Sequence, residues 1–85
     1  MMQQGLVIDD HPIVRQGIKD LLQKAVPSLS ITTSPGTDGV LEEVCGRHWA
    51  FVVVDINLPG LNGLDIVKQA RSHCPETPIL VFSLY

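Results

Sequence analysis

The chain has 85 residues and a formal net charge of −3, which leaves room for one domain only. With 45% hydrophobic and 18% charged residues, it is too apolar and too weakly charged for a disordered segment. The acidic balance, 6 Lys and Arg against 9 Asp and Glu, argues against binding of nucleic acid through its phosphates, and no apolar run suits a membrane span or a secretory signal.

The apolar pattern alternates between strand and helix periods along the chain. A continuous apolar run such as residues 50–55 (AFVVVD) is typical of a strand covered on both faces. Apolar residues three or four positions apart indicate a helix that buries one face. We expect strands at 6–8, 29–34, 50–55 and 79–83. The first helix is expected at 12–25, with an inward stripe of Val14, Ile18, Leu21, Leu22 and Ala25. A second helix should start at Thr37 or Asp38 and end at Gly46, and a third, between the last two strands, should have an inward stripe of Leu64, Val67 and Ala70.

This alternation predicts an α/β fold, with helices that flank a parallel sheet. If the strand order of that sheet is 2-1-3-4, the first and third strands are neighbours. Right-handed crossovers bring the carboxyl ends of all the strands to one edge of such a sheet. Ligands of open α/β sheets bind at that edge where the strand order reverses, which here is between the first and third strands.

Polar residues stand at three of these strand ends. Asp9 and Asp10 end the first strand, Asp55 ends the third, and Ser83 ends the fourth. Three converging carboxylates repel one another, and a hard divalent cation such as Mg²⁺ relieves that repulsion. A carboxylate beside such a cation can attack a phosphoryl group to form an aspartyl phosphate. The Ser83 hydroxyl is placed to donate a hydrogen bond to one phosphoryl oxygen.

Three further residues have a plainer interpretation. His11 follows the acidic pair, and we interpret it as a helix-start residue beside Pro12, with a metal ligand or a phosphate donor as the alternative. Cys45 and Cys74 are far apart in the sequence and have no other ligand-type residue at metal spacing. We therefore predict two reduced thiols in a cytoplasmic protein.

The sequence resembles the receiver domain of two-component response regulators. The resemblance lies in residues 7–18 (VIDDHPIVRQGI), 52–69 (VVVDINLPGLNGLDIVKQ) and 77–83 (TPILVFS), and it is greatest to the branch whose receivers are fused to a helix-turn-helix DNA-binding domain. It implies a flavodoxin-like fold and a domain that takes phosphate from a sensor histidine kinase to control transcription. It also implies a chain that catalyses only its own phosphorylation and dephosphorylation, and so is not otherwise an enzyme.

The resemblance also implies a role for each site residue. Asp55 is similar to the phosphoacceptor, and Asp10 to a direct Mg²⁺ ligand. Asp9 corresponds to a residue that acts on Mg²⁺ through a bound water. Asn57 corresponds to a further ligand through its backbone carbonyl, and its side chain to one that tunes the access of hydrolytic water. Ser83 is similar to the hydroxyl residue that switches the domain.

The length departs from the family pattern. A receiver has five strand–helix units, so we expect residues 1–85 to be one receiver domain that stops after the fourth strand, with no second domain. The family's Lys at the end of the fifth strand has no counterpart, and Lys68 lies on the polar face of the third helix. We therefore expect poor phosphorylation of Asp55, and contact with DNA only through an output domain outside these residues.

Two other functions deserve comparison. A phosphoaspartyl hydrolase also places a nucleophilic Asp after an apolar strand, but it carries a second Asp two positions on, where this chain has Asn57. The stronger alternative is a fragment that self-associates or binds partners without phosphorylation. In the family layout, the absence of the fifth helix exposes one sheet face and leaves residues 79–83 as an edge strand, which invites pairing with another chain.

Overall fold

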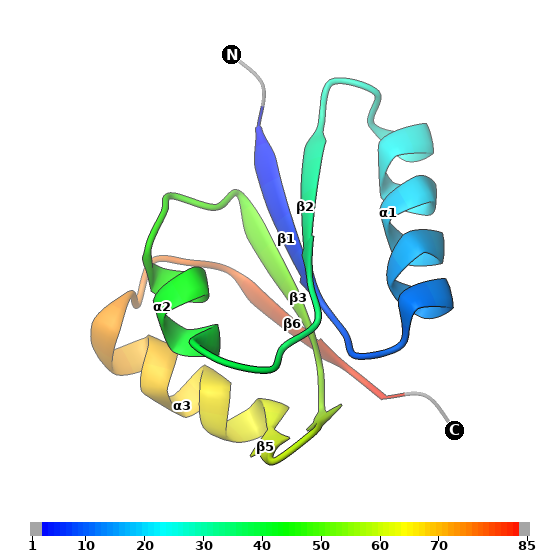
Figure 1. The fold of residues 1–85 in the computed structure, drawn as a ribbon. Coiled ribbons are helices and arrows are strands. Elements are labelled where there is room, and N and C mark those ends of the chain that lie inside the picture. The colour runs from blue at the N-terminus through cyan, green and yellow to red at the C-terminus, as the bar shows by residue number, and fades with distance from the viewer. Residues whose placement is uncertain (1–2, 84–85) are drawn as a thin grey trace.

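The computed structural model describes residues 3–83 and has the predicted alternation of strands and helices (Figure 1). The elements in chain order are β1 (Gln4–Ile8), α1 (Pro12–Ala25), β2 (Ser30–Ser34), α2 (Val40–Cys45), β3 (Phe51–Asp55), β4 (Asn57–Leu58), β5 (Leu61–Asn62), α3 (Gly63–His73) and β6 (Ile79–Phe82). No helix in this part of the chain is both long and apolar enough to cross a membrane.

The four longer strands form one parallel sheet in the order β2-β1-β3-β6, so the predicted order is confirmed with β6 as its fourth strand. The register pairs Ile8 with Val54 and Asp55 with Phe82, which aligns the carboxyl ends of the central strands. The segment after β3 forms a small antiparallel pair, β4 and β5, with Gly60 at a φ of 71° in the turn between them.

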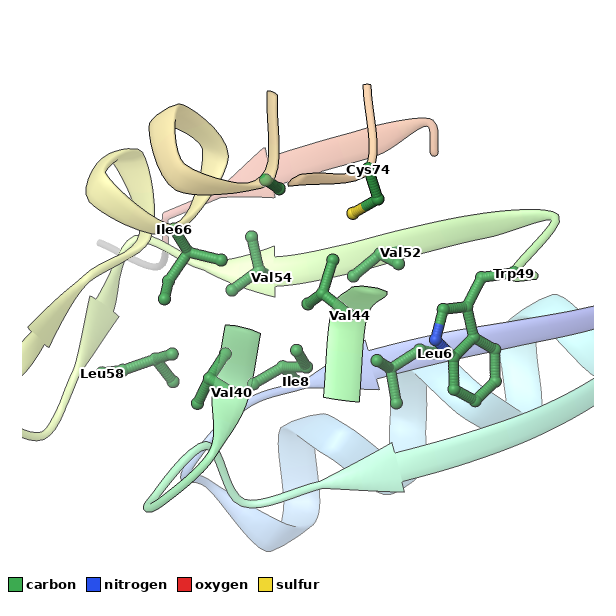
Figure 2. Close-up of a cluster of buried hydrophobic side chains, with 11 residues drawn as sticks. Leu6, Ile8, Val40, Val44, Trp49, Val52, Val54, Leu58, Ile66 and Cys74 are labelled. Atoms are coloured by element: carbon green, nitrogen blue, oxygen red, sulfur yellow. The ribbon is translucent and has the colours of Figure 1, made fainter. Parts of the chain in front are cut away.

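The larger part of the core lies between the sheet and the two helices α2 and α3 (Figure 2). Because successive side chains of a strand point to opposite faces, Leu6 and Ile8 of β1 point to the same side of the sheet. The indole of Trp49 is also buried, and its N–H donates a hydrogen bond to the Glu43 carbonyl at 2.8 Å. The buried members of this cluster are Leu6, Ile8, Val40, Val44, Trp49, Val52, Val54, Leu58, Ile66, Ala70 and Cys74.

Within residues 3–83, α1 is the one helix that covers the other sheet face, which has the smaller cluster. Its buried residues are Val7, Leu29 and Ile31, with Ile18, Leu22, Phe51 and Val53 packed against them. The helix itself contains no fully buried residue. The prediction that Leu21 faces inward is wrong, because its side chain is 70% exposed. The two sides of the sheet are therefore covered unequally.

Two details of the other helices also differ from the predictions. The N-cap of α2 is Gly39, which has a φ of 65°, rather than Thr37 or Asp38. In α3 the buried residues are Gly63, Ile66 and Ala70, so Leu64 lies outside the buried stripe and is half-exposed. The helix begins at Gly63, and the side chain of its N-cap Asn62 accepts a hydrogen bond from the Leu64 N–H at 2.8 Å.

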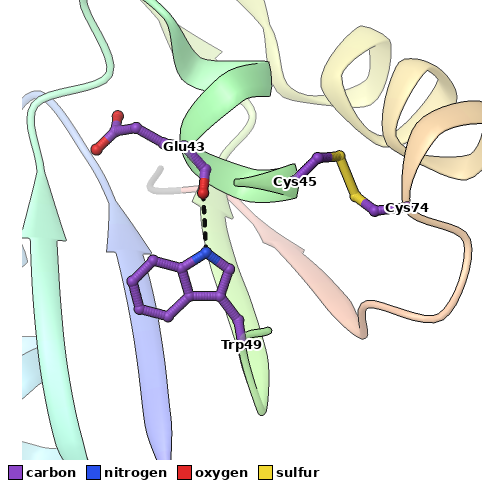
Figure 3. The surroundings of a disulfide bond; sticks show 4 residues. All are labelled: Glu43, Cys45, Trp49 and Cys74. Carbon is purple, nitrogen blue, oxygen red and sulfur yellow. Dashed lines mark hydrogen bonds between the residues drawn. A yellow bond between two sulfur atoms is a disulfide. The ribbon is translucent and has the colours of Figure 1, made fainter. Parts of the chain in front are cut away.

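The prediction of two reduced thiols is wrong in this structure, where Cys45 and Cys74 form a disulfide (Figure 3). Cys45 ends α2 and Cys74 is the C-cap of α3. These two helices lie on the same sheet face, and their ends bring the two Cα atoms to 5.5 Å. The two cysteines are 29 residues apart in sequence, and the packing of the helices brings them together. No local spacing pattern indicates this contact.

Candidate functional site

The acidic cluster lies at the carboxyl ends of β1 and β3. Asp9 and Asp10 follow β1, and Asp55 is the last residue of β3. His11, the N-cap of α1, joins them. Each of these four residues offers one ligand atom, and the four atoms all lie within 4.8 Å of one another. Neighbouring parallel strands therefore bring three carboxylates and an imidazole together from two separate parts of the chain.

Asp9 is the most buried member of this cluster, with an exposed fraction of 0%. Its Oδ1 accepts a hydrogen bond from the His11 backbone N–H at 2.9 Å. Its Oδ2 is buried and has no hydrogen-bond partner in the described part of the chain. The Arg15 guanidinium donates a hydrogen bond to the Asp9 carbonyl at 3.0 Å, a contact that the sequence pattern did not indicate.

Asp55 is also buried, with an exposed fraction of 2%. Its Oδ1 accepts a hydrogen bond from the Asn57 backbone N–H at 3.0 Å, which fixes the carboxylate against the turn that follows β3. The same turn is tied to the sheet by two backbone bonds, from Ile56 N–H to the Phe82 carbonyl and from Gly63 N–H to the Ile56 carbonyl, both at 2.8 Å. The chain on both sides of Asp55 is therefore held in place.

The remaining predicted residues lie around this cluster. Asn57 is exposed and adjoins Asp55 through the backbone contact just described. Ser83 is exposed and follows Phe82, the residue paired with Asp55, so it stands at the same edge of the sheet. Lys68 is exposed on α3, as its polar-face position predicted.

His11 starts α1, as interpreted from the sequence, and its side chain also lies beside two carboxylates. It is the N-cap of α1, and its Nδ1 lies 2.9 Å from Oδ1 of Asp9 and 3.1 Å from Oδ1 of Asp10. The hydrogen bond to Asp9, followed by the charge of Asp10, raises the pKa of His11 above 6.5. In the metal-free protein, the carboxylates therefore favour the imidazolium form.

The cluster has the composition of a site for a hard divalent cation. Its carboxylate oxygens are the donors that Mg²⁺ prefers. A buried carboxylate oxygen without a partner is costly, and a cation would satisfy Oδ2 of Asp9. The residues that would hold Mg²⁺ are Asp9, Asp10 and Asp55, with the Asn57 carbonyl as a further oxygen next to Asp55. These residues fit the ion.

Residues 6–85 match the protein family described as "Response regulator receiver domain". The chain belongs to this family. Among curated relatives, this receiver domain is 30% identical over 78 residues to the transcriptional activator protein ExaE of Pseudomonas putida and 35% identical over 81 residues to the nitrate/nitrite response regulator protein NarL of Escherichia coli. These matches cover 92% and 93% of the chain but only 36% and 37% of the relatives, so the chain spans little more than a third of their length.

Solved receiver structures have the same fold. The response regulator protein TrrA of Thermotoga maritima, solved in complex with Mg²⁺-BeF, superposes with a TM-score of 0.87 at 27% identity, over 99% of this chain and 71% of TrrA. TrrA has also been solved in complex with the histidine kinase ThkA, and that structure superposes with a TM-score of 0.85. This receiver domain therefore shares its sheet order and helix arrangement with a protein that binds both an ion complex and a kinase.

Proposed function

We propose that this receiver domain takes a phosphoryl group from a sensor histidine kinase onto Asp55, and thereby controls an output that regulates transcription. The geometry of Asp55 carries the proposal, because its buried carboxylate faces two further carboxylates at the edge of the sheet. The kinase complex of TrrA and the activator and regulator names of ExaE and NarL support the partner and the output.

Each residue of the site has its own role in phosphoryl transfer. A carboxylate oxygen of Asp55 attacks phosphorus while the bond from phosphorus to the donor nitrogen breaks, and the electron pair of that bond stays on the donor imidazole. When bound, Mg²⁺ supplies positive charge that offsets the charge on the phosphoryl oxygens. Asp9 and Asp10 hold that ion, and the Asn57 N–H keeps Asp55 oriented by its bond to Oδ1. Ser83 donates its hydroxyl to a phosphoryl oxygen.

The proposal also concerns whether the domain is an enzyme and where in the cell it is located. Asp55 is itself the group that is modified, so the domain is a phosphoacceptor and not an enzyme with a separate substrate. We place it in the cytoplasm, as the resemblance to receivers implies. A disulfide between Cys45 and Cys74 would there form against a reducing pool of thiols.

Small phosphate donors test the acceptor directly. When residues 1–85 are incubated with acetyl phosphate and Mg²⁺, we expect intact-protein mass spectrometry to show one added phosphoryl group on a minor fraction of the protein. The fraction is minor because these residues include no counterpart of the family's phosphoryl-binding Lys. Asp55→Asn should abolish the label, since an amide is a poor nucleophile.

The control is Asp65→Asn, which changes an exposed carboxylate in the first turn of α3 and should keep the label. Persistence of the label in the Asp55→Asn protein would show that another residue is the acceptor. Stoichiometric labelling of residues 1–85 would show that phosphorylation of Asp55 does not require such a Lys.

A second candidate function, self-association of this polypeptide, is favoured by β6. Within the described residues β6 is an edge strand that pairs only with β3, and edge strands can add another chain. Its Leu80 is paired in register with Val53 on the face that α1 covers, and the Leu80 side chain is 64% exposed. The occupant that fits this edge is a second copy of the same strand.

Light scattering after gel filtration tests this candidate. We expect residues 1–85 to elute as a dimer or a larger species at micromolar concentration, and Leu80→Lys to shift the population toward the monomer, because a charge on the edge opposes strand pairing. Ile13→Lys is the control, since Ile13 is 88% exposed but lies on α1. A monomer at all concentrations would exclude the candidate.

A further inference from the structure

The His11 imidazole lies among the three carboxylates of the site. Its Nδ1 lies 2.9 Å from Oδ1 of Asp9, 3.1 Å from Oδ1 of Asp10 and 3.9 Å from Oδ2 of Asp55. Oδ1 of Asp10 is inaccessible to solvent and makes no hydrogen bond to any described residue in spite of its closeness to Nδ1. The nitrogen thus lies beside an oxygen of each carboxylate.

These distances are similar to the distances between ligand atoms that bind the same metal ion. Ligands at about 2.1 Å from an octahedral cation stand about 3.0 Å apart when adjacent and about 4.2 Å apart when opposite. The separations from Nδ1 to Asp9 and Asp10 are close to the first value, and the separation to Asp55 is nearer the second. The nitrogen can therefore join the same shell as the carboxylates.

Independent support comes from Asp9, whose side chain is completely buried and whose Oδ2 has no partner among the described residues. A buried, unpartnered carboxylate oxygen in the same cluster is explained by a cation that binds there. The side chain of His11 itself is 58% exposed, so the ring can turn toward an incoming ion without opening the core.

A nitrogen ligand changes which cation such a site prefers. Mg²⁺ binds oxygen donors, whereas Mn²⁺, Co²⁺ and Zn²⁺ also accept imidazole nitrogen and bind mixed nitrogen and oxygen sites more tightly along that series. Three carboxylates alone offer only oxygen. Three carboxylates with His11 offer the mixed set.

We propose that His11 is a nitrogen ligand of the divalent cation in this receiver domain, and that it makes the site favour first-row transition cations over Mg²⁺ beyond what the carboxylates alone would give. The inference rests on the proposed function, because it concerns the cation of the same site. It adds the donor atom and the class of metal. Binding of the cation displaces any proton on the coordinating nitrogen.

Metal titrations of the whole 85-residue chain test the proposal at a pH above the His11 pKa. Co²⁺ is the main probe, because its visible absorption reports the ligand set, and Mg²⁺ competition gives the ratio of the two affinities. We expect His11→Ala to weaken Co²⁺ binding at least about tenfold, as loss of a metal-site residue usually does, and to leave Mg²⁺ binding nearly unchanged. The absorption band of bound Co²⁺ should also shift.

His48→Ala is the matched control, since His48 is an exposed histidine that precedes β3, at the opposite end of that strand from Asp55. It should leave both affinities and the spectrum unchanged. If His11→Ala alters neither the Co²⁺ affinity nor the spectrum, or strengthens binding of both cations because the ring competes with them, the proposal is overturned. The Asp55→Asn variant separates this failure from failure of the site itself. If the cluster is the cation site, this variant should weaken the binding of both Co²⁺ and Mg²⁺.

Discussion

Reduction of the Cys45–Cys74 disulfide is expected to lower the free energy of unfolding by about 3–4 kcal/mol. The bond closes a loop of 29 residues, and in the chain-entropy account a loop of that size removes about this much freedom from the unfolded chain. A small domain has a total stability of only about 5–15 kcal/mol, so the loss would be a large share. The disulfide also joins the ends of two helices that hold one side of the core.

Urea denaturation with and without a reductant measures this effect. The midpoint should fall on reduction, and the slope should rise because the reduced unfolded chain exposes more surface. A Cys45→Ala/Cys74→Ala double variant should behave like the reduced protein and should not respond to reductant, which controls for effects of the reagent. Equal midpoints for the oxidised and reduced protein would contradict the expectation.

Gly63→Ala should destabilise the domain by about 1–3 kcal/mol, the usual cost of forcing an extra methyl into a packed site. A Cβ at Gly63 would lie 2.7 Å from the Asp55 carbonyl oxygen and 2.8 Å from the Ile56 Cα, and both of these atoms belong to the backbone. The backbone at Asp55 would have to move. The same variant should therefore weaken divalent-cation binding, which a calorimetric titration with Mn²⁺ can measure alongside thermal unfolding.

Gly17→Ala is the matched control for this substitution. Gly17 lies in the middle of α1, and a Cβ there meets no atom within 4 Å. Alanine is the better helix former by about 0.5–1 kcal/mol, so this variant should be slightly more stable than the unchanged protein. Two variants with the same chemical change should thus shift the melting temperature in opposite directions. A loss of stability in both would contradict the steric explanation.

The sheet was predictable because its signal is local and repeated. The apolar residues 6–8 and the run at 50–55 were predicted to be buried strands, and their order is that of the flavodoxin-like fold that the resemblance to receiver domains implies. The convergence of Asp9, Asp10 and Asp55 on one edge follows from the same topology, since the carboxyl ends of parallel strands share an edge. Residues far apart in sequence were therefore placed together without any knowledge of side-chain contacts.

The details that were missed depend on packing between elements. Leu21 and Leu64 match a helical stripe as well as their neighbours do, but their side chains are 70% and 53% exposed, so the spacing alone does not decide which matching positions are buried. The link between Cys45 and Cys74 depends on two helix ends that meet across 29 residues. The contact from Arg15 to the Asp9 carbonyl spans six positions, which no helical pairing rule covers.

The place of the two central strands in the sheet has a consequence for how the domain opens. In the described part of the chain, both β1 and β3 have a strand on each side, whereas β2 and β6 each have a strand on one side. Local opening events detected by hydrogen exchange start where few bonds must break, at edges and at thinly covered helices. The amides of β1 and β3 should therefore be the slowest to exchange. Asp9 and Asp55 are carried by the part of the molecule that stays closed longest, so the cluster keeps its shape while the periphery of the domain fluctuates.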